Sequence, residues 1–379
     1  MPTPMYFVVP AGFDDPGRPS GGNRYDLELA RELDELGWAV HMKPVAGSWP
    51  RPADEDRREL DRILETIPEQ SMVLLDGLVA CGVPDIVAAH CGRQRLVVLV
   101  HLPLAAETGL EAQVARDLDH AERHALHRAS ASVATSRWTA QQLTDHHGLP
   151  GTRVHVAVPG VHLARLAPGS FQGGRHLLAV ASVTPRKGLD RLVEALAQLP
   201  SDLPWQLKIA GAQPDPAYAA LLHGMIAEAE LDERISILGP LTVPDLDAVY
   251  SWADLLVMPS DKEPWGMAVT EALARGIPVY ASDVGGVPEA LGHAAFPGET
   301  VLERPGRLLP PDSIVAWEQA LEEWMCTLRL RDRLRTLAEQ RQRTLPTWRS
   351  TALEVEMALR GFPSTPWHTD QEPEEPSLV

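Results

Sequence analysis

The sequence predicts two α/β domains in series, each with a parallel β-sheet covered by helices. Short apolar runs alternate along the chain with stretches of helical periodicity. This alternation stops over Pro159–Arg175, where Gly and Pro are frequent, and then begins again. A chain of 379 residues is long enough for two domains of ordinary size. We therefore expect two Rossmann-like domains that face each other across a cleft.

The first domain, expected over residues 1–165, contains six apolar runs of the kind that form buried strands. They are Tyr6–Val9, Ala39–Lys43, Met72–Leu75, Leu96–Val100, Ala131–Ala134 and Val154–Ala157. A helix is expected over Asn23–Leu36, because Tyr25, Leu29 and Leu33 recur at helical spacing. The Gly- and Pro-rich stretch after this domain is expected to be an interdomain linker.

The second domain, expected over residues 166–345, repeats the pattern. Its expected strands are Leu177–Ser182, Gln206–Ala210, Ser236–Leu238, Leu255–Met258 and Val279–Ala281. Its expected helices lie near Leu189–Leu199, Ala217–Ala229, Asp245–Trp252, Met267–Ala274 and Ile314–Thr327. The end of the chain, residues 363–379, holds four Pro and four acidic residues in 17 positions and is predicted to be disordered.

Composition excludes several classes of function. A formal net charge of −18 argues against nucleic-acid binding, which needs a cationic field. No apolar run approaches the roughly 18 to 20 residues of a membrane span, and no basic region precedes the apolar run at the start. The three cysteines form no C-x-x-C pair. We therefore expect a cytoplasmic protein without an integral membrane segment.

The run after the expected strand Leu255–Met258 carries the strongest chemical signal. Pro264 and Gly266 lie where a turn opens a helix, and backbone amides at such a point favour an anion such as a diphosphate. Glu263 and Glu271 would be about 12 Å apart on a helical path, which is the length of a nucleotide sugar. The alternative is that Glu263 is a surface residue and Glu271 a solvated helix position.

A second signal is the adjacent pair Arg186 and Lys187, which comes directly before Gly188 and a helix. Positive charge at a helix N-terminus costs a few tenths to about 1 kcal/mol unless an anion compensates. The pair therefore suggests a phosphate clamp, against the alternative of two solvated side chains.

In the first domain, Gly21 and Gly22 lie between the first strand and its helix and permit close approach of a ligand. They do not form the G-x-G-x-x-G fingerprint of a dehydrogenase. His101 follows a strand, at the end of the sheet where ligands bind, although a structural histidine is the usual alternative. His120, His124 and His127 share one helix face, but they lack the H-E-x-x-H order, and no metal site is expected.

Together these residues resemble the family-four group of retaining glycosyltransferases. Glu263 and Glu271 are similar to the family's E-x7-E element, which continues into a run similar to Ser282–Glu289. Arg186 and Lys187 resemble its basic pair. The resemblance covers nearly the whole chain and is strongest across Val180–Glu289.

Further features fit the same family. Gly21-Gly22 resembles its glycine loop, and His101 its cleft histidine. A helix within residues 346–362, over Thr347–Leu359, resembles the family's carboxyl-terminal helix that crosses back to the first domain. Two features depart from the family: Trp265 stands where Phe is frequent, and Ala181-Ser182 replaces a Gly-Arg pair.

The resemblance implies a GT-B fold, with the acceptor bound by the first domain and a nucleotide-diphosphate sugar by the second. Arg186 and Lys187 would stabilise the leaving diphosphate, and His101 would contact the sugar or the reaction centre. Glu263 would hold sugar hydroxyls and Glu271 the ribose. The remaining expected ligand contacts are Gly21, Gly22 and the amides of Gly266, Met267 and Ala268.

The expected reaction retains the anomeric configuration and needs no metal or cofactor besides the donor substrate. The donor base, UDP, GDP or ADP type, stays open. The acidic surface favours a small soluble acceptor or a glycan over a lipid. Two alternatives remain: a catalytically silent nucleotide-sugar-binding scaffold, and another GT-B enzyme such as a sugar-nucleotide epimerase or a phosphorylase.

Overall fold

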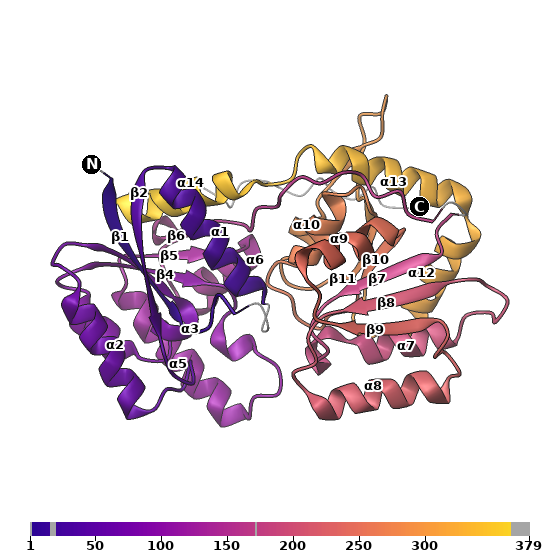
Figure 1. Ribbon diagram of the computed structural model, residues 1–379. Coiled ribbons are helices and arrows are strands. Elements are labelled where there is room, and N and C mark those ends of the chain that lie inside the picture. The colour runs from indigo at the N-terminus through magenta and orange to yellow at the C-terminus, as the bar shows by residue number, and fades with distance from the viewer. Residues whose placement is uncertain (1, 16–19, 171–172, 365–379) are drawn as a thin grey trace. The chain divides into compact units, whose positions relative to one another are not determined.

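The computed structural model describes residues 2–15, 20–170 and 173–364, and the chain divides into two compact units (Figure 1). The N-terminal unit comprises Met1–Asp14, Arg24–Val158 and Arg349–Val379, and the C-terminal unit comprises Asp15–Asn23 and Pro159–Trp348. Most of the expected disordered tail, from residue 365 on, lies outside the described residues.

The N-terminal unit contains a six-stranded parallel sheet with the order β2-β1-β3-β4-β5-β6. All six predicted strands form. Their bounds are β1 Thr3–Pro10, β2 Trp38–Val45, β3 Met72–Asp76, β4 Arg95–Val100, β5 Ala131–Ala134 and β6 Val154–Val156.

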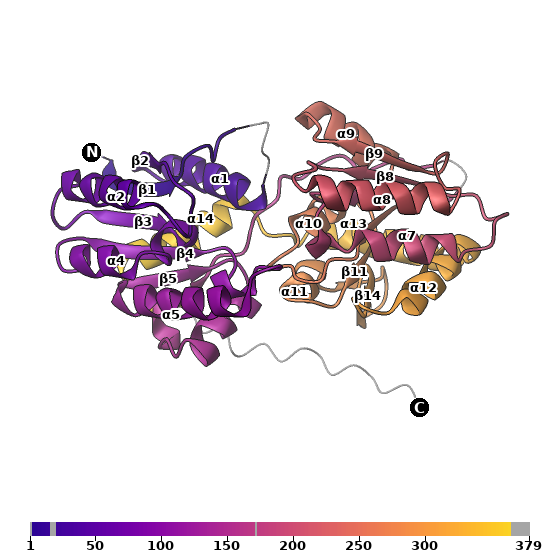
Figure 2. The ribbon, with the colours of Figure 1, turned by 90° about the horizontal axis from the view of Figure 1, so that it is seen from below.

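Helices cover both faces of this sheet. They are α1 Gly21–Glu35, α2 Asp54–Thr66, α3 Gly77–Ala80, α4 Pro84–His90, α5 Ala112–Arg128, α6 Arg137–Gln141 and α14 Trp348–Arg360, with short turns at Leu104–Ala106, Gln142–His146 and Gly151–Arg153. The helices α2, α4 and α5 pack in a row on one face, and α1 and α14 lie on the other (Figure 2). The face of α1 that carries Tyr25, Leu29 and Leu33 is buried, as its spacing predicted.

The helix α14 belongs to the N-terminal unit although it is the last described helix of the chain. Its Thr351 Oγ1 donates to Val158 O at 2.7 Å, and Trp38 Nε1 donates to Glu356 Oε1 at 3.2 Å. Its residues Val355 and Leu359 are fully buried. The sheet therefore receives one of its covering helices from the far end of the sequence.

The C-terminal unit contains a second six-stranded sheet, with the order β14-β11-β10-β7-β8-β9. Its strands are β7 His176–Val180, β8 Gln206–Ala210, β9 Ile235–Gly239, β10 Leu255–Met258, β11 Val279–Ser282 and β14 Gly306–Leu309, and β12 Ala294–Ala295 with β13 Leu302–Glu303 forms a small antiparallel pair. The strand β14 was not predicted. It is a short edge strand whose Gly and Arg interrupt the apolar pattern.

The helices of this unit are α7 Leu189–Ala197, α8 Pro216–Glu228, α9 Val243–Trp252, α10 Met267–Leu273, α11 Val287–Leu291, α12 Ile314–Cys326 and α13 Leu328–Gln342, with a 3-10 turn at Pro185–Lys187. The helix α7 packs between α8 and α12 on one face of the sheet (Figure 2). The helix α13 was not predicted, because only Leu334, Leu337 and Ala338 of its Arg-rich sequence are buried.

The Gly- and Pro-rich stretch after residue 158 forms no helix or strand among its described residues. It is nevertheless attached to the C-terminal unit: Val161 N donates to Pro346 O at 3.0 Å, and Ala167 N donates to Arg275 O at 2.8 Å. These bonds explain why the unit boundary falls at Val158, ahead of the boundary that we expected after residue 165.

Both sheets have a point at which the strand order reverses. This switch point lies between β1 and β3 in the N-terminal unit and between β7 and β10 in the C-terminal unit. Ligands of such sheets bind beyond the carboxyl ends of the strands at the switch point.

No described helix combines the length and apolar character that crossing a membrane requires.

Candidate functional site

In the C-terminal unit, the loops that follow β7 and β10 meet at the switch point. Arg186 and Lys187 lie in the 3-10 turn after β7, and Glu263 lies in the loop after β10. Lys187 Nζ is 2.5 Å from Glu263 Oε2, and the two side chains are only 13% and 12% exposed. The structure therefore brings together two motifs that are 76 residues apart in the sequence.

A second set of bonds fixes the two loops to each other. Asp261 N donates to Arg186 O at 2.9 Å, and Arg186 Nη1 donates to Lys262 O at 3.2 Å. Arg191, in the first turn of α7, donates from Nη2 to Asp261 Oδ1 at 2.5 Å and from Nη1 to Asp261 Oδ2 at 3.3 Å. Such bidentate pairs fix geometry as well as charge. The sequence analysis missed Arg191 and Asp261, although both flank the motifs that it identified.

The backbone of Glu263 is held by a glycine turn after β11. Gly286 N donates to Glu263 O at 3.0 Å. Gly285 has a φ of +55°, and a Cβ at this position would lie 2.0 Å from the same oxygen. Gly266, which precedes α10, also has a positive φ, of +91°. Only glycine adopts these conformations at such close contact without strain.

Glu271 lies within α10 and is only 7% exposed. Tyr250 of α9 donates from its hydroxyl to Glu271 Oε2 at 2.7 Å. The alternative of a solvated helix position is therefore wrong for Glu271. Met267 and Ala268 are the first two residues of the same helix and are partly exposed.

Three buried polar atoms around this loop lack a hydrogen-bond partner in the described part of the chain. They are Ser260 Oγ, Trp265 Nε1 and Ser282 Oγ. Trp265 lies in the loop between Glu263, which the sequence analysis assigned to the sugar, and Gly266, which it assigned to the helix start. Buried polar groups in native proteins are rarely left unpaired, and they concentrate at functional positions.

In the N-terminal unit, His101 directly follows β4, as predicted, and contacts two carboxylates. Its Nε2 lies 3.0 Å from Asp26 Oδ1 and 3.6 Å from Asp76 Oδ2. Asp26 belongs to α1, which follows β1, and Asp76 ends β3, so both lie at the switch point of this sheet. Both are buried, whereas the His101 side chain is 23% exposed. The sequence analysis missed both aspartates, although Asp76 ends an apolar run.

Burial and neighbouring charges change the protonation of His101 and Asp76. Burial lowers the pKa of His101, but the charge and hydrogen bond of Asp26 and the charge of Asp76 outweigh it and raise the pKa above 6.5. Burial, the Asp26 charge and a hydrogen bond to Asp26 raise the pKa of Asp76 to about 7, although His101 and the Leu78 amide act in the opposite direction. In the Asp26–Asp76–His101 cluster, the Asp76 carboxyl therefore titrates close to neutral pH.

Gly21 and Gly22 are the first two residues of α1 rather than part of the preceding loop. The Asn23 amide donates to Ser20 Oγ at 3.0 Å, so a serine caps this helix start. The predicted helix start at Asn23 was two residues late, because glycine gives no helical signal of its own.

The predicted line of His120, His124 and His127 on α5 does not form a group of ligand atoms. The rings of His120 and His124 are 4.3 Å apart, but His127 Nε2 is bonded to His147 O at 2.9 Å. In the described ranges, two other groups bring three possible metal-ligating atoms within 4.8 Å: the Asp26–Asp76–His101 cluster and Asp119, His146 and His147.

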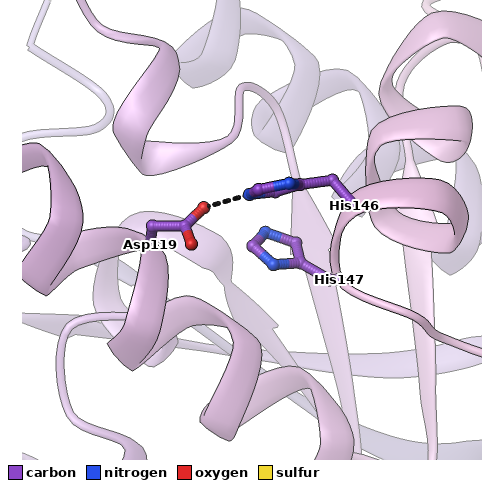
Figure 3. Close-up of side chains that lie close together, drawn as sticks. All are labelled: Asp119, His146 and His147. Carbon is purple, nitrogen blue, oxygen red and sulfur yellow. Dashed lines mark hydrogen bonds and ion pairs between the residues drawn. The ribbon is translucent and has the colours of Figure 1, made fainter.

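The side chains of Asp119, in the middle of α5, and of His146 and His147, at the end of the Gln142–His146 turn and just after it, lie close together (Figure 3). His146 Nε2 lies 2.6 Å from Asp119 Oδ1, and this pair is partly exposed. His147 is buried, and its Nε2 lies 3.2 Å from the buried carboxylate of Glu122. Both histidines thus already have carboxylate partners within the N-terminal unit.

Solved structures share this fold. Sucrose-phosphate synthase from Thermosynechococcus elongatus is similar with a TM-score of 0.74 and 22% identity, over 94% of this chain and 98% of that chain. Anabaena HepE, determined in complex with UDP and glucose, is similar with a TM-score of 0.74 and 16% identity, over 95% of this chain and 100% of that chain. Two six-stranded α/β units of this kind make up the GT-B fold.

Two family models divide the chain between them. Residues 19–165 match Glycosyltransferase Family 4, and residues 165–341 match Glycosyl transferases group 1. The chain belongs to the family-four GT-B glycosyltransferases.

Curated relatives match part of the chain. D-inositol 3-phosphate glycosyltransferase of Pseudarthrobacter chlorophenolicus is 32% identical over 207 residues, which are 51% of this chain and 47% of that protein. The protein of the same name from Jonesia denitrificans is 28% identical over 253 residues, which are 62% of this chain and 57% of that protein. The matched part thus spans about half the length of these relatives.

Proposed function

We propose that the protein transfers a sugar from a nucleotide-diphosphate sugar to an acceptor hydroxyl, with retention of the anomeric configuration and without a metal. The observation that carries this proposal is the Lys187–Glu263 pair with Arg186 at the switch point of the C-terminal sheet. It places two cations and a carboxylate where a sheet of this topology binds its ligand.

The two cations would stabilise the negative charge that develops on the departing diphosphate. Arg186 and Lys187 precede α7, whose N-terminus carries a partial positive charge and favours an anion. This partial charge repels the two cations, and a bound phosphate between them would turn the repulsion into attraction. Fixed cations in a partly buried site do the work that a metal ion does elsewhere. This is the basis for proposing metal independence.

The carboxylates would hold the rest of the donor. Glu263 can accept hydrogen bonds from sugar hydroxyls. Its backbone is held in place by the glycine turn after β11, which limits the directions that its side chain can take. Glu271, which also accepts a hydrogen bond from Tyr250, would accept hydrogen bonds from the ribose hydroxyls. That HepE was solved with UDP-glucose supports a nucleotide sugar as the donor class.

Retention is proposed through a short-lived ion pair on one face of the sugar. Neither the sequence analysis nor the described site identifies an enzymatic nucleophile, and a trapped covalent glycosyl-enzyme adduct would overturn this part of the proposal. His101 of the N-terminal unit would contact the sugar or the reaction centre.

The acceptor is proposed to be a small soluble molecule or a glycan, bound by the N-terminal unit of a cytoplasmic enzyme. The net charge of −18 disfavours anionic lipid surfaces. Inositol 3-phosphate is the first acceptor to test, because the name of the curated relatives contains it.

The alternative from another class is a nucleotide-sugar-binding scaffold without activity. The Lys187–Glu263 pair is largely buried, and removing two charges from water has a free-energy cost. This cost supports a ligand-binding role for the pair in both the enzyme and the scaffold. Turnover separates the two functions. An epimerase would alter the donor without an acceptor, and a phosphorylase would consume inorganic phosphate.

Calorimetric titration of UDP, GDP and ADP tests the donor site. We expect one nucleotide to bind, and Glu271→Ala to weaken it by roughly 1.5 to 3 kcal/mol, which is about 10- to 100-fold, because a charge-assisted hydrogen bond is lost. Glu194→Ala, an exposed glutamate of α7, is the matched control and should bind as the wild type does. Binding that is equal in all three proteins would remove Glu271 from the site.

A further inference from the structure

Two carboxylates from different elements face the same nitrogen of His101. Asp26 Oδ1 and Asp76 Oδ2 lie 3.0 and 3.6 Å from Nε2. An ionised carboxylate only accepts hydrogen bonds, so Nε2 carries a hydrogen in both the neutral and the charged form of the ring wherever at least one of the two carboxylates is ionised. The cluster therefore selects the Nε2–H tautomer.

Other contacts hold the members of the cluster in place. The Leu78 amide donates to Asp76 Oδ1 at 2.6 Å and fixes this carboxylate at the end of β3. Thr135 Oγ1 donates to His101 O at 3.1 Å. The Tyr25 ring meets the imidazole edge to face, with centroids 5.2 Å apart. These contacts oppose rotation of the His101 ring.

The fixed ring leaves one nitrogen for a ligand. Across the described residues, His101 Nδ1 has no hydrogen-bond partner, and the side chain is partly exposed. The cluster lies at the carboxyl ends of β1, β3 and β4, at the switch point of the N-terminal sheet. Nδ1 is therefore the nitrogen that a ligand at this position meets.

We propose that Asp26 and Asp76 are positioning residues that fix His101 with Nε2 turned inward, so that Nδ1 is the nitrogen presented to a sugar ligand at the carboxyl end of the N-terminal sheet. This inference rests on the proposed function for the identity of the ligand. The orientation and charge of the ring do not depend on it.

Charge supports the same assignment. Among the residues that the structure describes, the titratable groups that face His101 are Asp26 and Tyr25 from α1 and Asp76 from β3. The two carboxylates raise the pKa of His101 despite its burial, so more of the ring is protonated at neutral pH than in a free histidine. As the pH rises through this pKa, the ring loses its Nδ1 hydrogen and becomes an acceptor at that atom.

The test is a long-range ¹H–¹⁵N spectrum of the full chain labelled with ¹⁵N-histidine, recorded from about pH 5 to about pH 9. His101→Gln identifies the His101 signals among the 14 histidines. In the wild type we expect the neutral form to be the Nε2–H tautomer and the pKa to stand above 6.5. A neutral form protonated at Nδ1 would overturn the proposal, and this result needs only the wild type and a folded His101→Gln variant for the assignment.

Variants then assign the cause. Asp26→Asn should lower the His101 pKa by about 1 pH unit or more, and Asp76→Asn should lower it less, because Asp76 is farther from Nε2. Asp61→Asn is the matched control, since Asp61 contacts His90 at 2.7 Å in the same unit and should leave His101 unchanged. An unchanged His101 pKa in folded Asp26→Asn, or wild-type His101 signals that move on adding EDTA, would contradict the proposal.

Kinetics add a readout that a purely structural role would not move. Once a donor and acceptor are known, Asp26→Asn should shift the pH dependence of kcat to lower pH while the acceptor KM changes little. A fall in activity with an unshifted pH profile would assign Asp26 to stability alone. Because the spectra need no substrate, failure of the glycosyltransferase proposal would leave the tautomer result intact and separately readable.

Discussion

Replacing Lys187 by Ala is expected to lower glycosyl transfer by about 10²- to 10³-fold, the effect typical of removing one fixed group that stabilises transition-state charge. Lys187 Nζ contacts Glu263 at 2.5 Å with both side chains largely buried. Under the proposed function, the change removes a cation from the departing diphosphate, and it leaves the Glu263 carboxylate without this partner. We therefore expect kcat to fall and donor binding to weaken together, measured by steady-state transfer and by calorimetry.

Lys208→Ala is the matched control for this change. Lys208 belongs to β8 of the same unit, and its ammonium lies over the Trp252 ring, 4.1 Å from the centroid. It removes the same charge from the same sheet without touching the loops after β7 and β10. Equal activity loss in the two variants would show that overall charge, rather than position, explains the effect of Lys187.

Gly285→Ala is expected to reduce transfer by about 10²-fold, because misplacing a ligand-binding group by about 1 Å has an effect of that size. A Cβ at Gly285 would lie 2.0 Å from the backbone oxygen of Glu263, and backbone cannot move aside as a flexible side chain can. The Gly286 amide that holds this oxygen would be displaced with it. Activity measured on protein shown to be folded by its thermal transition checks this expectation.

Gly298→Ala separates the clash from backbone strain. Gly298 also has a positive φ, of +87°, but a Cβ there would meet no atom within 4 Å. Both variants incur the roughly 1 to 2 kcal/mol of a left-handed alanine, and only Gly285→Ala disturbs Glu263. If Gly298→Ala were as inactive as Gly285→Ala, the support of Glu263 by the glycine turn would not be the cause.

Local sequence patterns were sufficient for every strand of the two six-stranded sheets except β14, and for part of the candidate site. Buried strands are recognisable in the sequence as apolar runs. The rule that ligands bind at the carboxyl ends of such strands led to Lys187, Glu263 and His101. The contact between Lys187 and Glu263 required the strand order, because only the pairing of β7 with β10 brings the two loops together.

The features that were missed depend on tertiary contacts. Asp26 and Asp76 become a cluster with His101 only because β1, β3 and β4 are neighbours in the sheet. The burial of Glu271 follows from Tyr250 on another helix. The edge strand β14 and the helix α13 bury few apolar side chains, so their segments carry a weak periodic signal.

The measurement that tests the central proposal most directly is the anomeric ¹H NMR spectrum of the product. The protein would be incubated with the sugar form of the nucleotide that it binds and a panel of acceptors, in the presence of EDTA. We expect transfer to one acceptor, with the anomeric configuration of the donor retained. Inverted product, or a donor altered without an acceptor, would contradict the proposal, and nucleotide binding without turnover would favour the scaffold.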